Sequence, residues 1–489
     1  MLLSELLNKV KAIQVIGEAE KTEVIGITNS SKNVSKGKLF AAIKGYKTDG
    51  HKFIQDAINN GASGVILEDQ SQVPDEIFKH SNVVKIVVDN SRKALALFSN
   101  LIYNEPSKKL TLIGITGTKG KTTTSYYLKH ILETAGYKVG LIGTIANYIG
   151  HNKVETKLTT PESFEINELM KRMLDEGCSY CIMEVSSHSL SLNRVDGLDF
   201  NYGIFTNITA DHFDFHNTFE SYRDAKKILF DILSPKAKAI INIDDNNWTE
   251  LVNNSQSHSF FYGKNPAATY QIKNIAYDIN GTNFEIEFSD THYKFKTGLI
   301  GEFNAYNAAA AITTANKAGI DWETIIKSID TMPQVPGRFQ VISNDEKKVI
   351  VDYSHTTDSL KQALEAINNL VKGSRQIYTV FGCGGDRDKT KRPQMGKIAE
   401  ELSNSVIITS DNPRTENPLE IIDEINKGFT KSKPRIIENR DEAIKEAIHS
   451  SEKDAVVLIA GKGHEDYQEI NGVRHHFSDE EKVLEYLNK

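Results

Sequence analysis

Short apolar runs that stop at polar residues recur along the chain, and they predict strands alternating with helices. The alternation is most regular in the last third, where runs such as "VIVDYS", "QIYTVFG" and "AVVLIAG" are separated by stretches of helical periodicity. Strands that alternate with helices form parallel sheets in doubly wound domains. Such sheets bind ligands at the carboxyl ends of their strands, so the polar residues after each run are the candidate site residues.

Two polar stretches that contain proline predict the domain boundaries. One is Tyr103–Thr111, "YNEPSKKLT", and the other is Thr331–Phe339, "TMPQVPGRF". They divide the chain into segments 1–105, 106–334 and 335–489. We therefore expect an α/β protein of three domains: an N-terminal α/β domain, a central P-loop-type domain with a mostly parallel sheet, and a C-terminal Rossmann-like, doubly wound domain.

The composition is that of a globular protein, with 39% hydrophobic and 25% charged residues among 489. The formal net charge of −7 argues against broad binding to nucleic acid or to anionic membranes. No apolar run approaches the ~20 residues of a membrane span, and the N-terminal residues lack the apolar core of a signal peptide. The chain also has only three cysteines, too few for the disulfide framework of a secreted protein. Together these features predict a cytoplasmic protein.

Cys178 and Cys181 have the C-x-x-C spacing that occurs in zinc sites and in thioredoxin-like proteins. A structural zinc site needs about four ligands, and the sequence offers no second pair. The run "CSYCIMEV" predicts a strand, whereas a thioredoxin-like motif precedes a helix. We therefore expect both side chains to pack in a core.

A glycine-rich stretch, "ITGTKGKTTTS" at Ile115–Ser125, follows an apolar strand and opens a helix. It matches the end of the P-loop pattern at Gly120, Lys121 and Thr122, but an isoleucine stands where the first glycine should be. Backbone N–H groups and a helix N-terminus attract a triphosphate, Lys121 can reach its terminal phosphates, and the Thr122 hydroxyl can bind Mg²⁺. This stretch predicts an ATP site; the alternative is a glycine turn followed by a helix cap.

Polar clusters also follow the next two predicted strands. Glu184 ends the apolar run "CIMEV", and His212 lies in "TNITADHFDFH" after the following run. A carboxylate at a strand end opposite a phosphate loop suits Mg²⁺, which prefers oxygen ligands. Each cluster alone could be ordinary loop polarity, but two clusters after consecutive strands favour a metal-assisted phosphate site.

The spacing G-T-x-G-K-T resembles the phosphate loop of the Mur ligase family, and "EVSSH", "TNITADHFDFH", "YRDAKKILF" and "GEFNAYN" are similar to further motifs of that family. Its members are cytoplasmic enzymes that join an amino acid to a carboxylate and consume ATP. The resemblance implies an ATP-binding set of Gly117, Thr118, Lys119, Gly120, Lys121, Thr122, Thr123 and Asn304. It also implies the Mg²⁺ ligands Thr122, Glu184 and His212, and the catalytic residues Lys121, Glu184, His212 and Lys226, the last carbamylated by CO₂.

The substrate that carries the carboxylate is expected on the first two domains. The segment 28–54 resembles a uridine-binding segment of the family, although Ser30, Ser31 and Lys32 depart in part from its D-S-R. "LTTPES" is similar to a stretch that holds the muramoyl peptide, and it is also typical of a helix that begins at Pro161. The residues so implied for the UDP-linked muramoyl dipeptide are Ser31, Thr159, Thr160, Ser186 and Arg194.

Polar loops follow four strands of the third segment. They contain His355, Arg387 and Arg392, which are candidate ligands of the incoming amino acid. One of these loops contains D-N-P-R, which in the family accompanies meso-diaminopimelate. This diamine has an additional carboxylate at its far end, which Arg414 can bind in bidentate fashion. The implied diaminopimelate-binding set is Arg387, Asp411, Asn412, Pro413, Arg414, Gly461 and Glu465.

The resemblance therefore implies an ATP-dependent ligase that adds meso-2,6-diaminopimelate to UDP-N-acetylmuramoyl-L-alanyl-D-glutamate through an acyl phosphate, in peptidoglycan precursor synthesis. We expect small-molecule partners only, and a monomer. Within the class, a lysine-adding ligase would lack Arg414, and a folate-type polyglutamate ligase would not need a uridine-binding domain. A P-loop kinase or nucleotide switch would leave the loops of the third segment unexplained. Lys121, Glu184 and His212 together argue against a non-catalytic nucleotide-sugar-binding protein.

Overall fold

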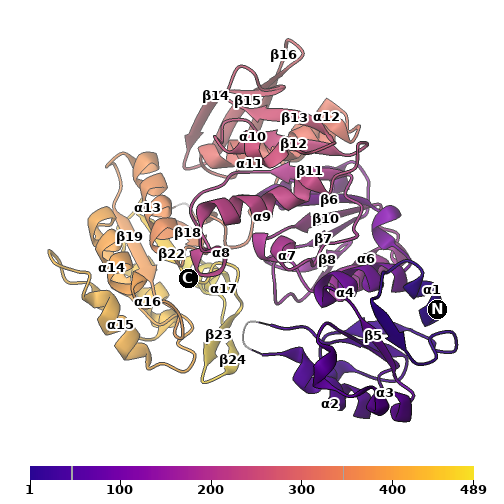
Figure 1. Cartoon of the computed structure of the whole chain (residues 1–489). Coiled ribbons are helices and arrows are strands. Elements are labelled where there is room, and N and C mark those ends of the chain that lie inside the picture. The colour runs from indigo at the N-terminus through magenta and orange to yellow at the C-terminus, as the bar shows by residue number, and fades with distance from the viewer. Residues whose placement is uncertain (46–47, 345, 489) are drawn as a thin grey trace. The chain divides into compact units, whose positions relative to one another are not determined.

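The computed structural model of the chain describes residues 1–45, 48–344 and 346–488 (Figure 1). The contacts group the chain into two compact units. Unit 1 consists of Met1–Gln271 with Asn307–Ile325, and unit 2 consists of Ile272–Tyr306 with Ile326–Lys489. Three larger sheets, each with helices packed against it, give the α/β architecture that the sequence predicts.

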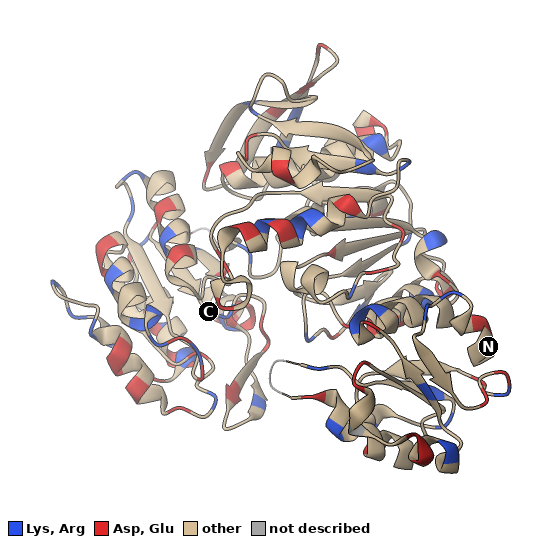
Figure 2. Ribbon diagram, viewed as in Figure 1, with Lys and Arg blue, Asp and Glu red and all other residues tan. Residues whose placement is uncertain are grey.

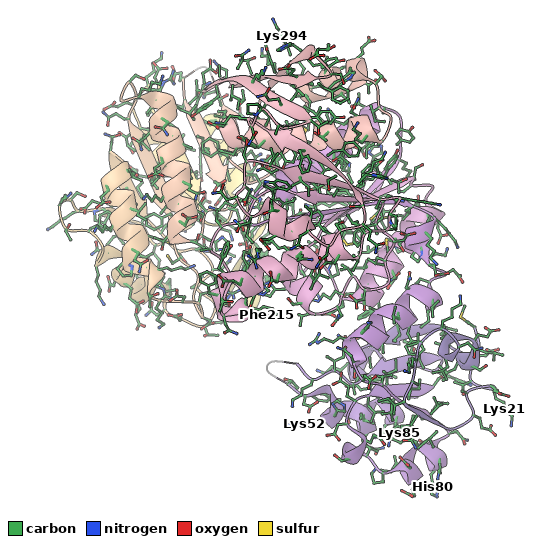
Figure 3. All side chains as sticks on the ribbon, turned by 45° about the horizontal axis from the view of Figure 1, so that its top comes forward. Lys21, Lys52, His80, Lys85, Phe215 and Lys294 are labelled. Atoms are coloured by element: carbon green, nitrogen blue, oxygen red, sulfur yellow. The ribbon has the colours of Figure 1, made fainter. Side chains whose placement is uncertain are left out.

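The first sheet of unit 1 has the strand order β1-β5-β4-β3-β2, with β1 antiparallel and the other neighbours parallel. Separate apolar clusters cover its two faces, as expected for strands that read as continuous apolar runs. Lys85 is nevertheless buried in β5; its Nζ lies 2.6 Å from Asp75 and 5.5 Å from the centre of the Phe78 ring (Figure 3). The elements are α1 (Leu3–Leu7), β1 (Gln14–Ile16), β2 (Gly26–Thr28), η1 (Ser31–Asn33), β3 (Lys38–Ala41), η2 (Gly50–Phe53), α2 (Ile54–Asn59), β4 (Gly64–Leu67), η3 (Gln70–Gln72), α3 (Asp75–Ser81), β5 (Val84–Val87) and α4 (Ser91–Ile102).

The central sheet of unit 1 contains the parallel order β13-β12-β11-β6-β10-β7, continued by the antiparallel strands β8 and β9. Its register places Glu184, the last residue of β10, beside Ile115 of β6. Polar residues that follow both strands therefore meet at one edge of the sheet. The elements are η4 (Pro106–Lys108), β6 (Thr111–Thr116), α5 (Lys121–Thr134), β7 (Val139–Ile142), β8 (Asn147–Ile149), β9 (Asn152–Val154), α6 (Ser163–Asp175), β10 (Tyr180–Glu184), α7 (Ser187–Ser191), β11 (Tyr202–Phe205), α8 (Phe213–His216), α9 (Phe219–Asp231), β12 (Lys238–Asn242), α10 (Trp248–Val252) and β13 (His258–Gly263).

The sheet of unit 2 has the order β17-β18-β22-β19-β20-β21, parallel except for the edge strand β17. Helices α13, α14 and α15 pack on one apolar face and α16 and α17 on the other, so the domain is doubly wound (Figure 1). The elements are β17 (Gln340–Ser343), β18 (Lys348–Asp352), α13 (Thr357–Val371), β19 (Ile377–Phe381), α14 (Lys391–Leu402), β20 (Ser405–Ile408), α15 (Pro418–Asn426), β21 (Arg435–Ile436), α16 (Arg440–Ser450), β22 (Val456–Ala460), the hairpin β23 (Tyr467–Ile470) and β24 (Val473–His476), and α17 (Asp479–Leu487).

The stretch between β13 and the linker at Thr331–Phe339 holds strands and helices that the sequence pattern did not predict, and its strands β14, β15 and β16 belong to the same sheet as β13. Strands β15 and β16 pair along their length as an antiparallel hairpin. The elements of this stretch are β14 (Tyr270–Asp278), β15 (Gly281–Phe288), β16 (Thr291–Thr297), α11 (Glu302–Lys317) and α12 (Trp322–Asp330).

The fold class is confirmed, and Cys178 and Cys181 are free and buried as expected. The boundaries near 105 and 335 stay a prediction. One expectation was wrong: α6 begins at Ser163 with Glu162 as its N-cap, so Pro161 precedes the helix. The structure instead uses the preceding threonine in a hydrogen-bonded cluster described below.

Charges of both signs are interspersed over the helices of both units (Figure 2). Among the described residues, no helix is both long enough and apolar enough to cross a membrane.

Candidate active site

The phosphate loop lies between β6 and α5 and is fixed by the residues that follow β11. Thr206 donates from its hydroxyl to the Lys119 carbonyl at 2.7 Å. The Asn207 side-chain amide binds both backbone groups of Lys119: it accepts from the N–H and donates to the carbonyl, both at 3.0 Å. The Thr118 N–H in turn donates to the Asn207 carbonyl at 2.8 Å. The "TN" of "TNITADH" thus holds the loop in shape before any ligand binds.

Two glycines of the loop are required by geometry. Gly120 has φ +86, a left-handed conformation that favours glycine, and it is the N-cap of α5. A Cβ at Gly117 would collide with the Thr206 hydroxyl. The loop can therefore be shorter than a standard P-loop and still turn tightly from strand to helix.

Two lysines meet at this loop. The Nζ of Lys121 donates to the carbonyls of Gly117 and Thr118, at 2.7 and 3.0 Å. The Nζ of Lys226, from α9, donates to the same Gly117 carbonyl at 2.9 Å and lies 4.3 Å from the centre of the Tyr222 ring. Burial lowers the pKa of Lys226 well below its usual value, and the positive charge of Lys121 lowers it further. Lys226 is therefore a candidate for a neutral, reactive amine.

Glu184 is fully buried and receives hydrogen bonds from two elements. The Thr122 hydroxyl, at the start of α5, donates to Oε2 at 2.9 Å. Thr144, after β7, donates from its N–H to Oε1 at 3.1 Å and from its hydroxyl to Oε2 at 2.8 Å. Three donors compensate the charge of the buried carboxylate. The predicted pair of Thr122 and Glu184 is therefore brought together.

Four residues predicted to bind the muramoyl dipeptide also gather at Glu184. The Thr160 hydroxyl donates to the Glu184 carbonyl at 2.7 Å and accepts from the Ser186 N–H at 3.1 Å. Arg194 donates to the Thr160 carbonyl at 3.0 Å. The Thr159 hydroxyl lies 3.1 Å from the Thr144 hydroxyl, which can accept its proton while donating its own to Glu184. The predicted peptide-binding residues and the predicted magnesium ligand therefore form one network.

Histidines after β10 and β11 form an aromatic cluster. The His188 ring centre lies 4.8 Å from that of His212 and 5.5 Å from that of His216. Burial, with a smaller contribution from charge on the two neighbouring histidines, lowers the pKa of His188 to about 4. A neutral ring at physiological pH allows the three imidazoles to pack closely.

The donor set at Glu184 fits Mg²⁺ better than a nitrogen-preferring metal. The Thr122 hydroxyl and the Glu184 carboxylate are oxygen donors beside a phosphate loop, which suits a hard cation that keeps several waters. His212 contacts His188, and its Nε2 lies 3.8 Å from Asp211. Within the described part of the chain, no group of three histidine, cysteine or acidic side chains could hold a metal. His212 as a metal ligand stays a prediction.

In unit 2, the D-N-P-R loop follows β20 and contacts two other loops. Asp411 and Asn412 are buried, and a Cβ at Gly461 would collide with the Asp411 carboxylate. Arg414 has φ +54, and its backbone exchanges hydrogen bonds with Glu469 and Asn471 of the β23–β24 hairpin, at 3.0 and 2.7 Å. An unusual backbone conformation at a non-glycine residue points to a position that its surroundings impose.

Glu465 is joined to this loop by a buried lysine. The Asn412 amide donates to Glu465 at 2.8 Å, and Lys462 Nζ lies 3.2 Å from the same carboxylate oxygen. Lys462 is completely buried and also donates to the Tyr467 carbonyl. Burial raises the pKa of Glu465, and the charge of Lys462 opposes that shift. Glu465, which the sequence predicts to bind an ammonium of the substrate, is thus held in place by the buried ammonium of Lys462.

Three further predicted residues lie on segments not yet described. Ser31 lies in η1, where its carbonyl accepts from Asn60 at 2.9 Å. Asn304 belongs to unit 2 and donates to the Ile300 carbonyl at 2.9 Å. Arg387 is exposed on the loop after β19. Residues 46 and 47, inside the predicted uridine-binding segment, lie outside the described residues. Their roles stay predictions.

Sequence reasoning missed residues that hold the site together. Thr144 and Thr206 each follow a parallel strand, so the strand-end rule could have identified them. Asn207 and Lys462 lie inside motifs already recognised in the sequence, but the sequence does not show that their side chains turn back onto the backbone or a neighbouring loop.

A phosphate loop beside a buried strand-end carboxylate, with a doubly wound domain of charged loops, defines an α/β protein of the nucleotide-phosphate-binding class. Three family models match the chain: "Mur ligase family, catalytic domain" at residues 23–103, "Mur ligase middle domain" at 115–315, and "Mur ligase, glutamate ligase domain" at 337–463. The chain belongs to the Mur ligase family.

Individual relatives match over the whole length. The chain is 44% identical to the UDP-N-acetylmuramoyl-L-alanyl-D-glutamate–2,6-diaminopimelate ligase of Clostridium tetani, covering 100% of both chains. It is 40% identical to the ligase of the same name from Bacteroides thetaiotaomicron, again covering 100% of both chains. A solved structure of a ligase of that name is 32% identical with a TM-score of 0.72, covering 100% of this chain and 99% of that one.

Proposed function

We propose that the protein is an ATP-dependent ligase that adds meso-2,6-diaminopimelate to UDP-N-acetylmuramoyl-L-alanyl-D-glutamate in peptidoglycan precursor synthesis, in the cytoplasm and as a monomer. The observation that carries the proposal is the network around Glu184. There Thr122 of the phosphate loop and Thr160 of the predicted peptide-binding group bind the same residue, through its side chain and its carbonyl. A nucleotide phosphate and a peptide carboxylate bound at these residues would be neighbours.

The reaction would proceed in two steps. The D-glutamyl carboxylate attacks the γ-phosphorus of ATP, the bond to ADP breaks, and an acyl phosphate forms. The neutral amine of diaminopimelate then attacks the acyl carbon, its nitrogen loses one proton to solvent, and inorganic phosphate leaves with its bonding electrons from the tetrahedral intermediate. The protein's contribution is positioning and stabilisation of negative charge.

Residues of unit 1 have distinct roles in the first step. The backbone of the Gly117–Lys121 loop cradles the phosphates, and the ammonium of Lys121 neutralises charge on the terminal ones. Glu184 and Thr122 would hold Mg²⁺, with His212 as the further ligand that the family implies. The bound ion would draw charge from the phosphate oxygens. Arg194 already pairs with Glu162 at 2.7 Å and would present its remaining donors to the muramoyl peptide.

Lys226 would be carbamylated. Its lowered pKa favours the neutral amine, which adds to the carbon of CO₂ and releases one proton to give a carbamate anion. Such an anion would exchange a buried positive charge beside Lys121 for a favourable ion pair. The modification therefore relieves the repulsion that contributes to the lowered pKa.

Unit 2 would bind the amine. Glu465 would pair with an ammonium of diaminopimelate, and Arg414 and Arg387 would bind its carboxylates. The particular observation that favours diaminopimelate over lysine is an arginine after "DNP", because lysine has no distal carboxylate to bind there.

The test is a phosphate-release assay with purified protein, ATP, Mg²⁺ and the UDP-linked dipeptide, with mass spectrometry of the product. Phosphate release that depends on meso-diaminopimelate, with a product heavier by one diaminopimelate residue, would support the proposal. ATP hydrolysis that is indifferent to any amino acid would favour a kinase or nucleotide switch instead.

A further inference from the structure

Two loops of unit 2 cross at the carboxyl end of its sheet, and each carries one of the two arginines assigned to the amino acid. The Gly385 N–H donates to the Asn412 carbonyl at 2.9 Å, and Arg414 donates back to the Gly385 carbonyl at 2.7 Å. A Cβ at Gly385 would collide with the Pro413 carbonyl. The Arg387 loop and the Arg414 loop are therefore in direct backbone contact.

A buried guanidinium lies beneath this crossing. Arg392, near the start of α14, has no exposed side-chain surface. Its two terminal nitrogens bind both oxygens of Glu416 at 3.0 Å, and one of them also binds Glu424 of α15 at 2.8 Å. The other donates to the Gly384 carbonyl at 3.2 Å. One side chain thus connects α14, α15 and both loops.

Glu416 completes the connection from the other side. Its Oε1 accepts the Asp386 N–H at 2.6 Å, and its Oε2 lies 3.0 Å from Lys389. The hydrogen bonds from Arg392, followed by contacts with Lys389 and Asp386, lower the pKa of Glu416 to about 2. The carboxylate therefore remains ionised at physiological pH and keeps its charge opposite Arg392.

A second contact, which we call the rim contact, joins the exposed edges of the two loops at Thr415 and Asp386. The Thr415 hydroxyl donates to the Asp386 carboxylate at 2.8 Å, and the Thr415 N–H donates to it at 3.2 Å. Asp386 has φ +53, so the turn that precedes Arg387 adopts a conformation that its neighbours must support. Both sides of the crossing therefore fix the direction in which Arg387 leaves the loop.

We propose that Arg392 and Glu416 form a clasp that sets the spacing between Arg387 and Arg414 and thereby the selectivity for an amino acid with a distal carboxylate. This proposal rests on the proposed function. The sequence groups Arg392 with the loop arginines, but its burial and the hydrogen bonds of both its terminal nitrogens make it a positioning residue rather than a substrate ligand. Binding groups must be held within a fraction of an ångström, and a buried ion pair fixes two loops more rigidly than exposed contacts do.

The helix that carries Arg392 also carries a glutamate, Glu400, that serves as a matched control for Glu416. Glu400 of α14 accepts the N–H groups of Thr430, Lys431 and Ser432, at 3.1, 2.8 and 2.7 Å. These bonds lower its pKa to about 2, as for Glu416, although it tethers a different loop. Glu400→Gln therefore removes a comparable tether without touching either arginine loop.

The experiment compares Glu416→Gln, Glu400→Gln and wild type in steady-state phosphate release, with each substrate varied in turn. Glu416→Gln is expected to raise the KM for meso-diaminopimelate on the order of 10- to 100-fold, because misplacement by about 1 Å has effects of that size. The kcat and the KM values for ATP and the dipeptide should stay within about threefold, and the preference for diaminopimelate over L-lysine should fall. Glu400→Gln should leave all KM values near those of wild type.

A milder variant covers the case in which Glu416→Gln does not fold. Thr415→Val removes the hydroxyl's part of the exposed rim contact, keeps the N–H bond to Asp386, and is expected to raise the diaminopimelate KM by a smaller factor. Unchanged KM and selectivity in Thr415→Val and in any folded Glu416→Gln protein, or equal changes for all substrates, would overturn the clasp while leaving the proposed function intact. Absence of diaminopimelate-dependent phosphate release in wild type would overturn the proposed function, and the clasp's role in selectivity with it.

Discussion

The hydroxyl of Thr122 donates to the carboxylate of Glu184 at 2.9 Å, although 62 residues separate them in sequence. One begins the helix after the phosphate loop, and the other ends the neighbouring parallel strand β10. The parallel register of β6 and β10 is what brings them to the same edge of the sheet. This pair joins the predicted nucleotide site to the peptide-binding group at Thr160.

Glu184→Gln is expected to lower kcat on the order of 10²- to 10³-fold, because it removes the anion that would hold Mg²⁺ while keeping the shape of the side chain. The hydroxyls of Thr122 and Thr144 can rotate to accept from the new amide, so the fold should persist. The measurement is phosphate release against Mg²⁺ concentration, with a thermal melt of each protein. Thr144→Ser keeps its hydroxyl and serves as the control. A Glu184→Gln enzyme within about threefold of wild type would exclude this role for the carboxylate.

Activity is expected to depend on dissolved CO₂, because the lowered pKa of Lys226 favours the neutral amine that reacts with it. Removing bicarbonate should lower the rate, and restoring it should recover the rate. Lys226→Ala should be nearly inactive and insensitive to bicarbonate. Activity of wild type that is unchanged in CO₂-free buffer would argue against carbamylation.

The same lysine makes a prediction about stability. In the unfolded chain its pKa is about 10.4, so between the lowered folded value and ~10 the unfolded state binds more protons. The contribution of Lys226 to the free energy of unfolding therefore becomes more favourable as pH rises through that window. The measurement is the melting temperature of wild type and of Lys226→Met, without bicarbonate, at about pH 7 and about pH 9. The melting temperature of wild type relative to that of the variant should be higher at about pH 9 than at about pH 7. A constant difference would contradict the lowered pKa.

Arg440→Ala is expected to destabilise unit 2 by about 3–5 kcal/mol, since it leaves a buried carboxylate unpaired. The Arg440 guanidinium and Asp479 are both fully buried and paired at 2.7 Å, and the same guanidinium donates to the Ala460 carbonyl at 3.0 Å. Urea unfolding followed by circular dichroism measures the change. Arg435→Ala, which removes a half-exposed pair with Glu446, should cost under about 1 kcal/mol. An equal decrease in the free energy of unfolding in the two variants would show that burial does not determine how much each ion pair contributes to stability.

Much of the fold follows from sequence pattern, because continuous apolar runs and helix signals repeat in every domain. Asn417 and Pro418 have the residue types typical of a helix start and stand at the start of α15, and Gly136, with a positive φ, follows the C-cap of α5, where helices commonly end in glycine. The hairpin of β15 and β16 was not assigned. Its strands bury most of one face and expose the other, so apolar and polar residues alternate along them and the apolar-run criterion did not identify them.

The candidate site was predictable at strand ends and less so between them. The position of Glu184 follows from an apolar run that stops at a carboxylate, but its bond to Thr144 depends on the course of the loop after β7. Arg392 shows the limit most clearly. Its sequence neighbourhood is that of a ligand loop, and only the packing of α14 against α15 reveals a buried ion pair.

We expect Arg414 to bind the distal carboxylate of a diamine that attacks an activated muramoyl dipeptide. The most direct test is competition between meso-diaminopimelate and L-lysine for incorporation into the product, in wild type and in Arg414→Ala, read by mass spectrometry. Wild type is expected to incorporate diaminopimelate at least about 100-fold more efficiently than lysine, and the variant is expected to lose most of this preference. Equal incorporation by wild type, or a variant that retains the full preference, would contradict it.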